Sequence, residues 1–313
     1  MGKGKTTLLF AGQGSQYIGM GKDLYKNYPE SRRVFEEANE SLKMNLTELI
    51  FNGSKSDLDL TINTQPAVVT MSLAAYKALD RYGIKVDLMA GLSLGEYSAL
   101  TAGGALSISQ VIPLVRKRGQ FMQEAVPEGV GKMVAILGLS ADKLLEACEE
   151  ASSYGIVEVA NYNCPGQIVI AGEFKAVDEA ANIAVAKGAI KAIDLPVSAP
   201  FHTSMLKPAA IRLKEELELI KVDKPRLPII SNVTADYIKD LTTIKSLLYK
   251  QVMTSVLWEQ TIRKMIADGV NTFVEVGPGK TLSAFVRRID RKLNIYNIED
   301  AASLEAFARR EEG

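Results

Sequence analysis

Residues 88–100 read LMAGLSLGEYSAL, and the five residues from Gly91 to Gly95 have the form G-x-S-x-G. The apolar stretch Val86–Ala90 predicts a buried strand before the serine, and a helix is expected after it. A serine between two glycines at such a junction is typical of a nucleophile elbow, where the tight turn tolerates little bulk. The amino end of the helix favours negative charge beside the serine. We therefore expect Ser93 to be a nucleophile; a serine that merely caps a buried helix is the alternative.

A serine hydroxyl needs a base at neutral pH, and the base is most often histidine. His202 is the only histidine in the chain, and it lies in the stretch APFHT at 199–203. This stretch follows directly after a predicted inserted domain, and clefts between domains commonly bind ligands. We expect His202 to be the base, with activity falling below about pH 6–7 if its pKa is unshifted.

Composition limits the classes of function. The 313 residues suggest two domains, and 37 basic residues balance 37 acidic ones. A chain without net charge offers no general attraction to nucleic acid or to a membrane surface, so neither is expected as a partner. Cys148 and Cys164 are too far apart for a CxxC motif, and with a single histidine no metal site is expected. Two cysteines without a disulfide framework favour a cytoplasmic location.

The pattern of the elements changes between Pro127 and Pro196. There we expect the order β-α-β-β-α-β, which is a ferredoxin-like unit. Its expected strands are 133–137, 157–161, 167–171 and 189–195, and its helices are 141–151 and 175–187. We therefore predict a small domain over residues 128–196, inserted into a larger α/β domain made of residues 1–127 and 197–313.

Strands and helices alternate in the larger domain. Strands are expected at 6–10, 86–90, 227–231 and 272–276. Helices are expected at 31–43, 64–82, 113–123, 244–252 and 258–268, with further helices that begin near Met20 and after Ser93, Pro208 and Gly279. The tail from Ala308 to Gly313 is expected to be frayed.

Seven stretches together carry a resemblance to a known family. In chain order they are GQGSQ at 12–16, TQPA at 64–67, GLSLGEYSAL at 91–100, RKRGQFMQ at 116–123, NYNCPGQIVIAG at 161–172, APFHT at 199–203 and VGPG at 276–279. In order and spacing the chain resembles the malonyl-CoA:acyl carrier protein transacylases, from about Leu8 to Arg288. The resemblance implies an α/β-hydrolase-like large domain with a ferredoxin-like insertion. It also implies a cytoplasmic, usually monomeric enzyme of fatty acid biosynthesis.

The resemblance implies a ping-pong reaction that needs no cofactor. Ser93 takes the malonyl group from malonyl-CoA, and the phosphopantetheine thiol of acyl carrier protein then receives it. His202 is the general base, oriented by the main-chain carbonyl at Gln251. The backbone N–H groups of Gln13 and Leu94 form the oxyanion hole. If a carboxylate orients the histidine instead, Asp194 and Glu275 are the candidates.

The resemblance also assigns the residues that select the acyl group. Arg118 matches the arginine that binds the free carboxylate of malonate, and a bidentate guanidinium fixes such a group in geometry. Its neighbours Arg116 and Lys117 are expected on a solvated face. Phe201 resembles the malonyl type rather than the methylmalonyl type. Leu92 departs from the family, which usually has histidine there, and this puts a local hydrogen bond in doubt.

Three alternatives stay open: a serine thioesterase or other hydrolase, an acyltransferase that serves a polyketide pathway, and a non-catalytic module that binds CoA or nucleotides. Carrier proteins are acidic, so a basic patch should receive them. The candidate residues for this patch are Arg287, Arg288, Arg291 and Lys292.

Overall fold

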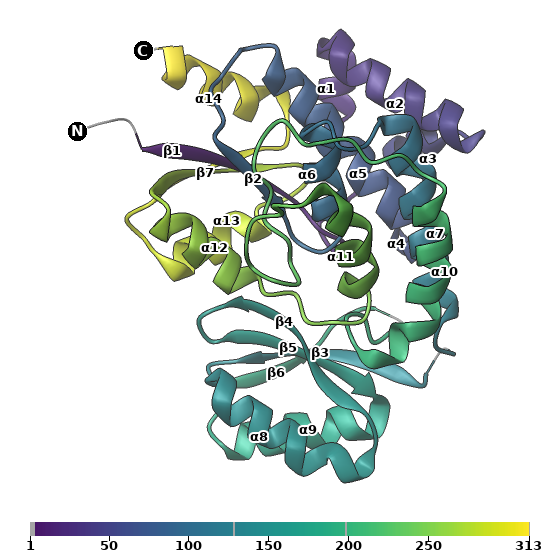
Figure 1. Ribbon diagram of the computed structural model, residues 1–313, viewed down its shortest axis with the longest axis vertical. Helices are drawn as coiled ribbons and strands as arrows, with labels where there is room; N and C mark the ends of the chain where they lie inside the picture. The colour runs from purple at the N-terminus through teal and green to yellow at the C-terminus, as the bar shows by residue number, and fades with distance from the viewer. Residues whose placement is uncertain (1–3, 128, 198, 313) are drawn as a thin grey trace.

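Two separate β-sheets, one parallel and one antiparallel, organise the chain (Figure 1). The computed structural model describes residues 4–127, 129–197 and 199–312. Residue 128, at which the predicted insertion begins, lies outside the described residues.

The parallel sheet has the strand order β2-β1-β7-β8. Its strands are β1 (Lys5–Phe10), β2 (Leu88–Gly91), β7 (Val270–Val276) and β8 (Asn294–Ile298). The last four residues of β1 and of β7 are buried without alternation. Continuous burial is expected of parallel strands with both faces covered. The carboxyl ends of β1, β2 and β7 consequently meet at one edge of the sheet, and the Ser93 turn begins there.

Helices cover both faces of this sheet. In Figure 1, α12 and α13 lie on one side, and α14, α1, α2 and α5 lie on the other. The helices of this part are α1 (Lys22–Asn27), α2 (Pro29–Leu42), α3 (Leu46–Asn52), α4 (Lys55–Asp59), α5 (Thr61–Asp80), α6 (Gly95–Ala102), α7 (Ile108–Glu124), α10 (Lys207–Glu218), α11 (Ile244–Gln251), α12 (Trp258–Ala267), α13 (Thr281–Ile289) and α14 (Ala301–Glu312). Among the described residues, no helix combines the length and the apolar character needed to cross a membrane.

The antiparallel sheet has the order β4-β5-β3-β6, and its elements follow the chain as β-α-β-β-α-β. They are β3 (Gly131–Leu137), α8 (Ala141–Ala151), β4 (Val157–Cys164), β5 (Gln167–Glu173), α9 (Phe174–Ala186) and β6 (Lys191–Asp194). Side chains of β3 alternate between two cores, as the pleat of a strand requires. Val134 and Ile136 pack with α8 and α9, whereas Met133 and Ala135 join the main core. The sheet is therefore covered by its own helices on one face and by the larger part of the chain on the other (Figure 1).

Helix α7 begins earlier than predicted, because Pro113 lies inside it instead of starting it. The hydroxyl of Ser107 accepts the N–H of Gln110, whose side chain accepts the N–H of Ser107 in return. This capping box stabilises the helix start at Ile108. The proline removes one backbone hydrogen bond, and burial of Val111, Ile112 and neighbouring residues outweighs that loss.

Two other predictions were wrong. The segment 227–231 forms no full strand: it makes a single bridge from Ile229 to Met89, and Ile230 pairs back with Tyr237. The tail as far as Glu312 belongs to the helix α14, because Leu304 and Phe307 are buried in the main core; Gly313 lies outside the described residues. In addition, strand β8 and the short helices α3 and α4 were not predicted, whereas α1 is the helix expected near Met20.

Candidate active site

Ser93 lies in the turn between β2 and α6, with a left-handed backbone at φ 51°. The two flanking glycines are required by space. A Cβ on Gly91 would collide with the backbone of Gly95, and a Cβ on Gly95 would collide with the carbonyl of Phe10. The G-x-S-x-G pattern therefore indicates a turn that is packed tightly between β2, α6 and the end of β1.

His202 lies against the serine, although 109 positions separate them in the chain. The Oγ of Ser93 is 2.8 Å from Nε2, and Nδ1 is 2.8 Å from the main-chain carbonyl oxygen of Gln251. A carbonyl only accepts hydrogen bonds, so Nδ1 carries the proton and Nε2 accepts from the serine hydroxyl. The arrangement is that of a serine and its base, with the imidazole oriented by a carbonyl.

Burial keeps His202 neutral. Loss of solvent is the main cause, and the nearby charge of Arg118 adds to it; together they lower the pKa of His202 to about 4. The condition of an unshifted pKa, on which the expected loss of activity below about pH 6–7 depended, is therefore not met. The sequence alone does not reveal that the imidazole is buried.

Arg118 projects from α7 to the same place and is only 1% exposed. One Nη donates to the Oγ of Ser93 and to the Oε1 of Gln251, each at 3.2 Å, and the other donates to the Oε1 of Gln65 at 2.8 Å. Within the described parts of the chain, Arg118 forms no ion pair, and its Nε has no partner. Burial lowers the pKa of Arg118, and the nearby side chains of Tyr97 and Glu96 oppose that shift only in part. Since no carboxylate among the described residues accepts a hydrogen bond from Arg118, its N–H groups can bind an incoming anion.

The two residues before Arg118 on α7 lie elsewhere. Lys117 pairs with Glu216 of α10 at 2.7 Å, and Arg116 contacts the sulfur of Met44. The exposure of Lys117 agrees with a solvated helix face. Only Arg118, of the three cations, reaches the serine.

The turn after β1 brings Gln13 to the same cavity as Leu94. Neither backbone N–H donates to an acceptor among the residues that the structure describes. Two free N–H groups beside a serine could receive a developing oxyanion.

Neither alternative carboxylate contacts the imidazole. Asp194 has a side chain 74% exposed at the edge of the antiparallel sheet, where it pairs with Lys132. Glu275 is buried, and its two oxygens accept the N–H groups of Leu282 and Ser283 at the start of α13. A carbonyl at Gln251 therefore occupies the place that a carboxylate would take in a triad.

The cavity around Ser93 has a volume of about 570 Å³ and lies between the two sheets. Its walls combine Ser93, His202 and Arg118 with apolar side chains such as Met133, Val169 and Phe201. Leu92 also lines the cavity and packs with the core that covers β2. The side chain of Leu92 therefore forms part of an apolar wall, where the histidine usual in the family would offer a hydrogen-bonding group. The described residues contain no group of three histidine, cysteine or acidic side chains arranged to bind a metal ion.

Sequence reasoning missed several polar groups beneath the serine. Asn232, Glu96, Gln65 and the side chain of Gln251 are all buried and hydrogen-bonded to the site or to one another. Glu96 was visible in the helix after the serine. Asn232 comes from a distant segment with no recognisable motif.

Comparisons with known proteins identify the family and the relatives of this chain. The family model described as acyl transferase domain matches residues 7–311. The malonyl CoA-acyl carrier protein transacylase of Bacillus subtilis is 47% identical over 302 residues, which is 96% of this chain and 95% of the relative.

Solved structures show the same fold. A malonyl CoA-acyl carrier protein transacylase from Clostridium perfringens superposes with a TM-score of 0.95 at 47% identity, covering 98% of this chain and 97% of its own. A malonyl-transacylase in complex with its type II PKS acyl-carrier protein superposes with a TM-score of 0.95 at 38% identity, covering 98% of this chain and 99% of its own. The chain therefore belongs to the acyl transferase family, among the relatives of the malonyl CoA-acyl carrier protein transacylases.

Proposed function

We propose that this protein transfers a malonyl group from malonyl-CoA to the phosphopantetheine thiol of an acyl carrier protein. The observation that carries the proposal is the position of Arg118. Its buried guanidinium lies 3.2 Å from the Oγ of Ser93 and hydrogen-bonds only to neutral groups. A malonyl ester on Ser93 would place its free carboxylate within reach of that charge. Charge-assisted hydrogen bonds of this kind contribute about 1.5–3 kcal/mol each.

In the first half-reaction, Ser93 attacks the thioester carbonyl carbon while the Nε2 of His202 takes the hydroxyl proton. The N–H groups of Gln13 and Leu94 stabilise the oxyanion, and loss of one such donor costs about 3–4 kcal/mol in other enzymes. The carbon–sulfur bond then breaks. The CoA thiolate leaves with the proton from His202, and a malonyl ester remains on Ser93.

In the second half-reaction, the carrier thiol gives its proton to His202 and attacks the ester carbonyl. The tetrahedral intermediate collapses, the Oγ of Ser93 leaves, and His202 returns the proton to it. Gln251 supports both halves through its carbonyl, which holds the protonated Nδ1 in place. The chemistry needs no cofactor beyond the substrate thioesters.

The carrier protein is proposed to dock at the cations near the end of α13. Arg287, Arg288, Arg291 and Lys292 are exposed, and Arg288 also donates to Gln167 of the antiparallel sheet at 2.7 Å. Leu282 and Phe285 of the same helix line the cavity, as Gln167 does. An acidic carrier bound there would have its thiol arm close to the opening.

The finer description of the fold is likewise a proposal. We infer an α/β-hydrolase-like domain of residues 1–127 and 197–313 and a ferredoxin-like domain of residues 128–196. The element order β-α-β-β-α-β and the separate apolar core of the antiparallel sheet support this division. A monomeric state, a cytoplasmic location and a place in fatty acid biosynthesis stay predictions.

The decisive experiment separates transfer from hydrolysis. The protein is loaded with radiolabelled malonyl-CoA, and the label on Ser93 is followed after addition of holo carrier protein or of buffer alone. We expect a stable malonyl ester in buffer and rapid discharge onto the carrier. Rapid discharge in buffer would instead favour a thioesterase. Comparing a fatty acid carrier with a polyketide carrier in the same assay tests the choice of pathway.

A further inference from the structure

Asn232 lies beneath the elbow and has no part in the proton transfers above. Its Oδ1 accepts the backbone N–H of Ser93 at 2.5 Å, and its Nδ2 donates to the carbonyl of Gly91 at 2.8 Å. The side chain is fully buried. One amide therefore bridges the two peptide groups on either side of Leu92. We propose that Asn232 is a positioning residue, which holds Ser93 in its left-handed conformation with the hydroxyl directed at His202.

An amide side chain supplies both interactions at neutral pH. The bridge needs one acceptor and one donor in a single plane; an ionised carboxylate has no donor, and one hydroxyl oxygen does not reach both groups. Left-handed backbone at a residue other than glycine costs of order 1–3 kcal/mol. The two hydrogen bonds of Asn232 oppose relaxation of Ser93 from that conformation.

Glu96 connects Asn232 to a second amide. Its Oε2 accepts the backbone N–H of Asn232 at 3.0 Å and the Nε2 of Gln251 at 2.7 Å. The same Nε2 lies 3.1 Å from the carbonyl oxygen of Ser93. The N–H and the carbonyl of Ser93 are thus each hydrogen-bonded to a buried amide side chain, and both amide residues contact the carboxyl of Glu96. Burial raises the pKa of Glu96 to about 7.

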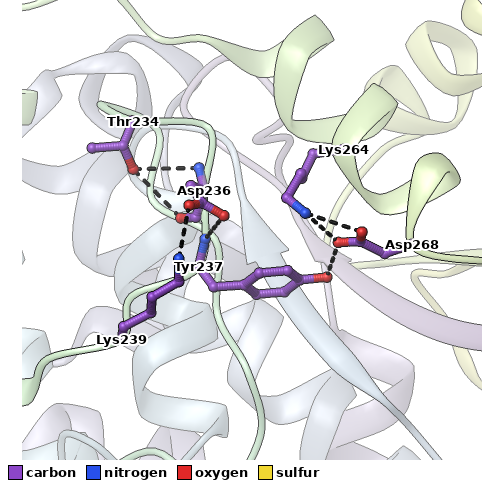
Figure 2. Close-up of polar contacts among 6 residues, drawn as sticks. All are labelled: Thr234, Asp236, Tyr237, Lys239, Lys264 and Asp268. Carbon is purple, nitrogen blue, oxygen red and sulfur yellow. Dashed lines mark hydrogen bonds and ion pairs between the residues drawn. The ribbon is translucent and has the colours of Figure 1, made fainter.

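A short hairpin carries Asn232 and is anchored at its far side. Ile230 pairs with Tyr237, and the N–H of Leu257 donates to the carbonyl of Asn232 at 3.0 Å. Figure 2 shows the ring of Tyr237 reaching from the hairpin toward Asp268, to which its hydroxyl donates at 2.7 Å. Lys264 of α12 pairs with the same carboxylate at 2.7 Å.

The inference rests on the proposed role of Ser93 as nucleophile, so two reagents are needed. Rapid-quench measurement of Ser93 malonylation tests the inference together with the proposed function. Labelling of Ser93 by a fluorophosphonate tests the serine and its base without any malonyl group. If the native enzyme reacts only with the fluorophosphonate, the proposed function fails, and the labelling rates of the variants still test Asn232.

For Asn232→Ala, we expect the rate constant of acylation per active molecule to fall on the order of 100-fold with both reagents. A merely structural role would lower the fraction of active enzyme, seen as the burst amplitude, and leave this rate constant unchanged. Tyr237→Phe is the matched control on the same hairpin. It removes the hydrogen bond to Asp268 but keeps the ring, so it should lower stability and leave the rate constant within about twofold. A rate constant for Asn232→Ala equal to that of Tyr237→Phe would overturn the proposal.

Asn232→Asp keeps the proposal testable if the alanine variant does not fold. A protonated carboxyl can accept from Ser93 and donate to Gly91 as the amide does, whereas an ionised one faces the carbonyl oxygen of Gly91 without a proton to donate. The ratio of variant to native acylation rate should therefore rise several-fold from about pH 8 to about pH 6. A ratio that does not change with pH would contradict the bridging role.

Discussion

The two sheets of this protein place polar groups very differently. Among the residues that the structure describes, left-handed backbone outside glycine occurs at Lys43, Ser93, His202 and Ala235, all of them outside the antiparallel part. Between residues 129 and 197, the fully described buried polar side chains are Asn161 and Asn163, and both line the cavity. The ion pairs of that part, such as Lys187 with Glu146, lie at its surface. The parallel part therefore holds the strained backbone and most of the buried polar side chains, whereas the antiparallel part supplies an apolar wall.

The largest effect should come from removing the nucleophile in the parallel part. Ser93→Ala should lower malonyl transfer by a factor on the order of 10⁴–10⁶, because no covalent intermediate can form. Mass spectrometry after incubation with malonyl-CoA should find the native protein, but not the variant, heavier by one malonyl group. Transfer that survives in the variant would mean that another residue carries the acyl group.

Arg118→Ala should have the next largest effect. We expect kcat/KM for malonyl-CoA to fall about 100-fold, since up to two charge-assisted hydrogen bonds are lost. The relative acceptance of acetyl-CoA should rise because no unpaired cation faces the neutral acyl group. Lys117→Ala is the matched control on the same helix, and it should behave as the native enzyme does. Unchanged selectivity in Arg118→Ala would refute the carboxylate role.

The pH dependence of kcat and kcat/KM tests the buried site of the parallel part. His202, as the proposed base, must be neutral to act, and its pKa of about 4 predicts that kcat/KM stays high well below pH 6.5. Bound malonate would neutralise Arg118 and remove part of the cause of this low pKa. The acid limb of kcat should therefore lie at higher pH than that of kcat/KM. Coincident limbs, with chemistry rate-limiting, would contradict this coupling.

The same pKa has a consequence for stability. Since the unfolded imidazole binds a proton below about pH 6.5 and the folded one does not, the free energy of unfolding should decrease as the pH falls from there towards 4. Native enzyme and His202→Gln compared by chemical denaturation would show it, because the variant lacks this part of the dependence.

The smallest effect on activity is expected in the antiparallel part. Ile170 of β5 is fully buried among the side chains of α8 and α9. Ile170→Val should cost about 0.5–1.5 kcal/mol of unfolding free energy, measured with a chemical denaturant. The kcat of the folded enzyme should not change. A large loss of kcat at unaltered stability would show that this part does more than form a wall.

Local patterns were sufficient to predict part of this molecule. The strand before Ser93, the helix after it and the β-α-β-β-α-β order all follow from residues adjacent in the chain. The helix α14 was missed because burial of Leu304 and Phe307 depends on neighbours far away in sequence.

In the site, too, local sequence motifs predict some residues, whereas others depend on segments that are distant in the chain. Ser93, His202 and Arg118 stand in recognisable motifs, and the structure brings them together. Asn232 stands 139 positions from the N–H that it accepts, directly after a segment wrongly predicted to be a strand. The low pKa of His202 likewise arises only when distant segments exclude water.

The left-handed backbone at Ser93 has an evolutionary consequence. Glycine adopts such a conformation freely, so a glycine there would relieve the local strain. Selection for a more robust fold alone would tend to erase the reactive hydroxyl. A serine at this point thus keeps a reactive hydroxyl at the expense of local stability.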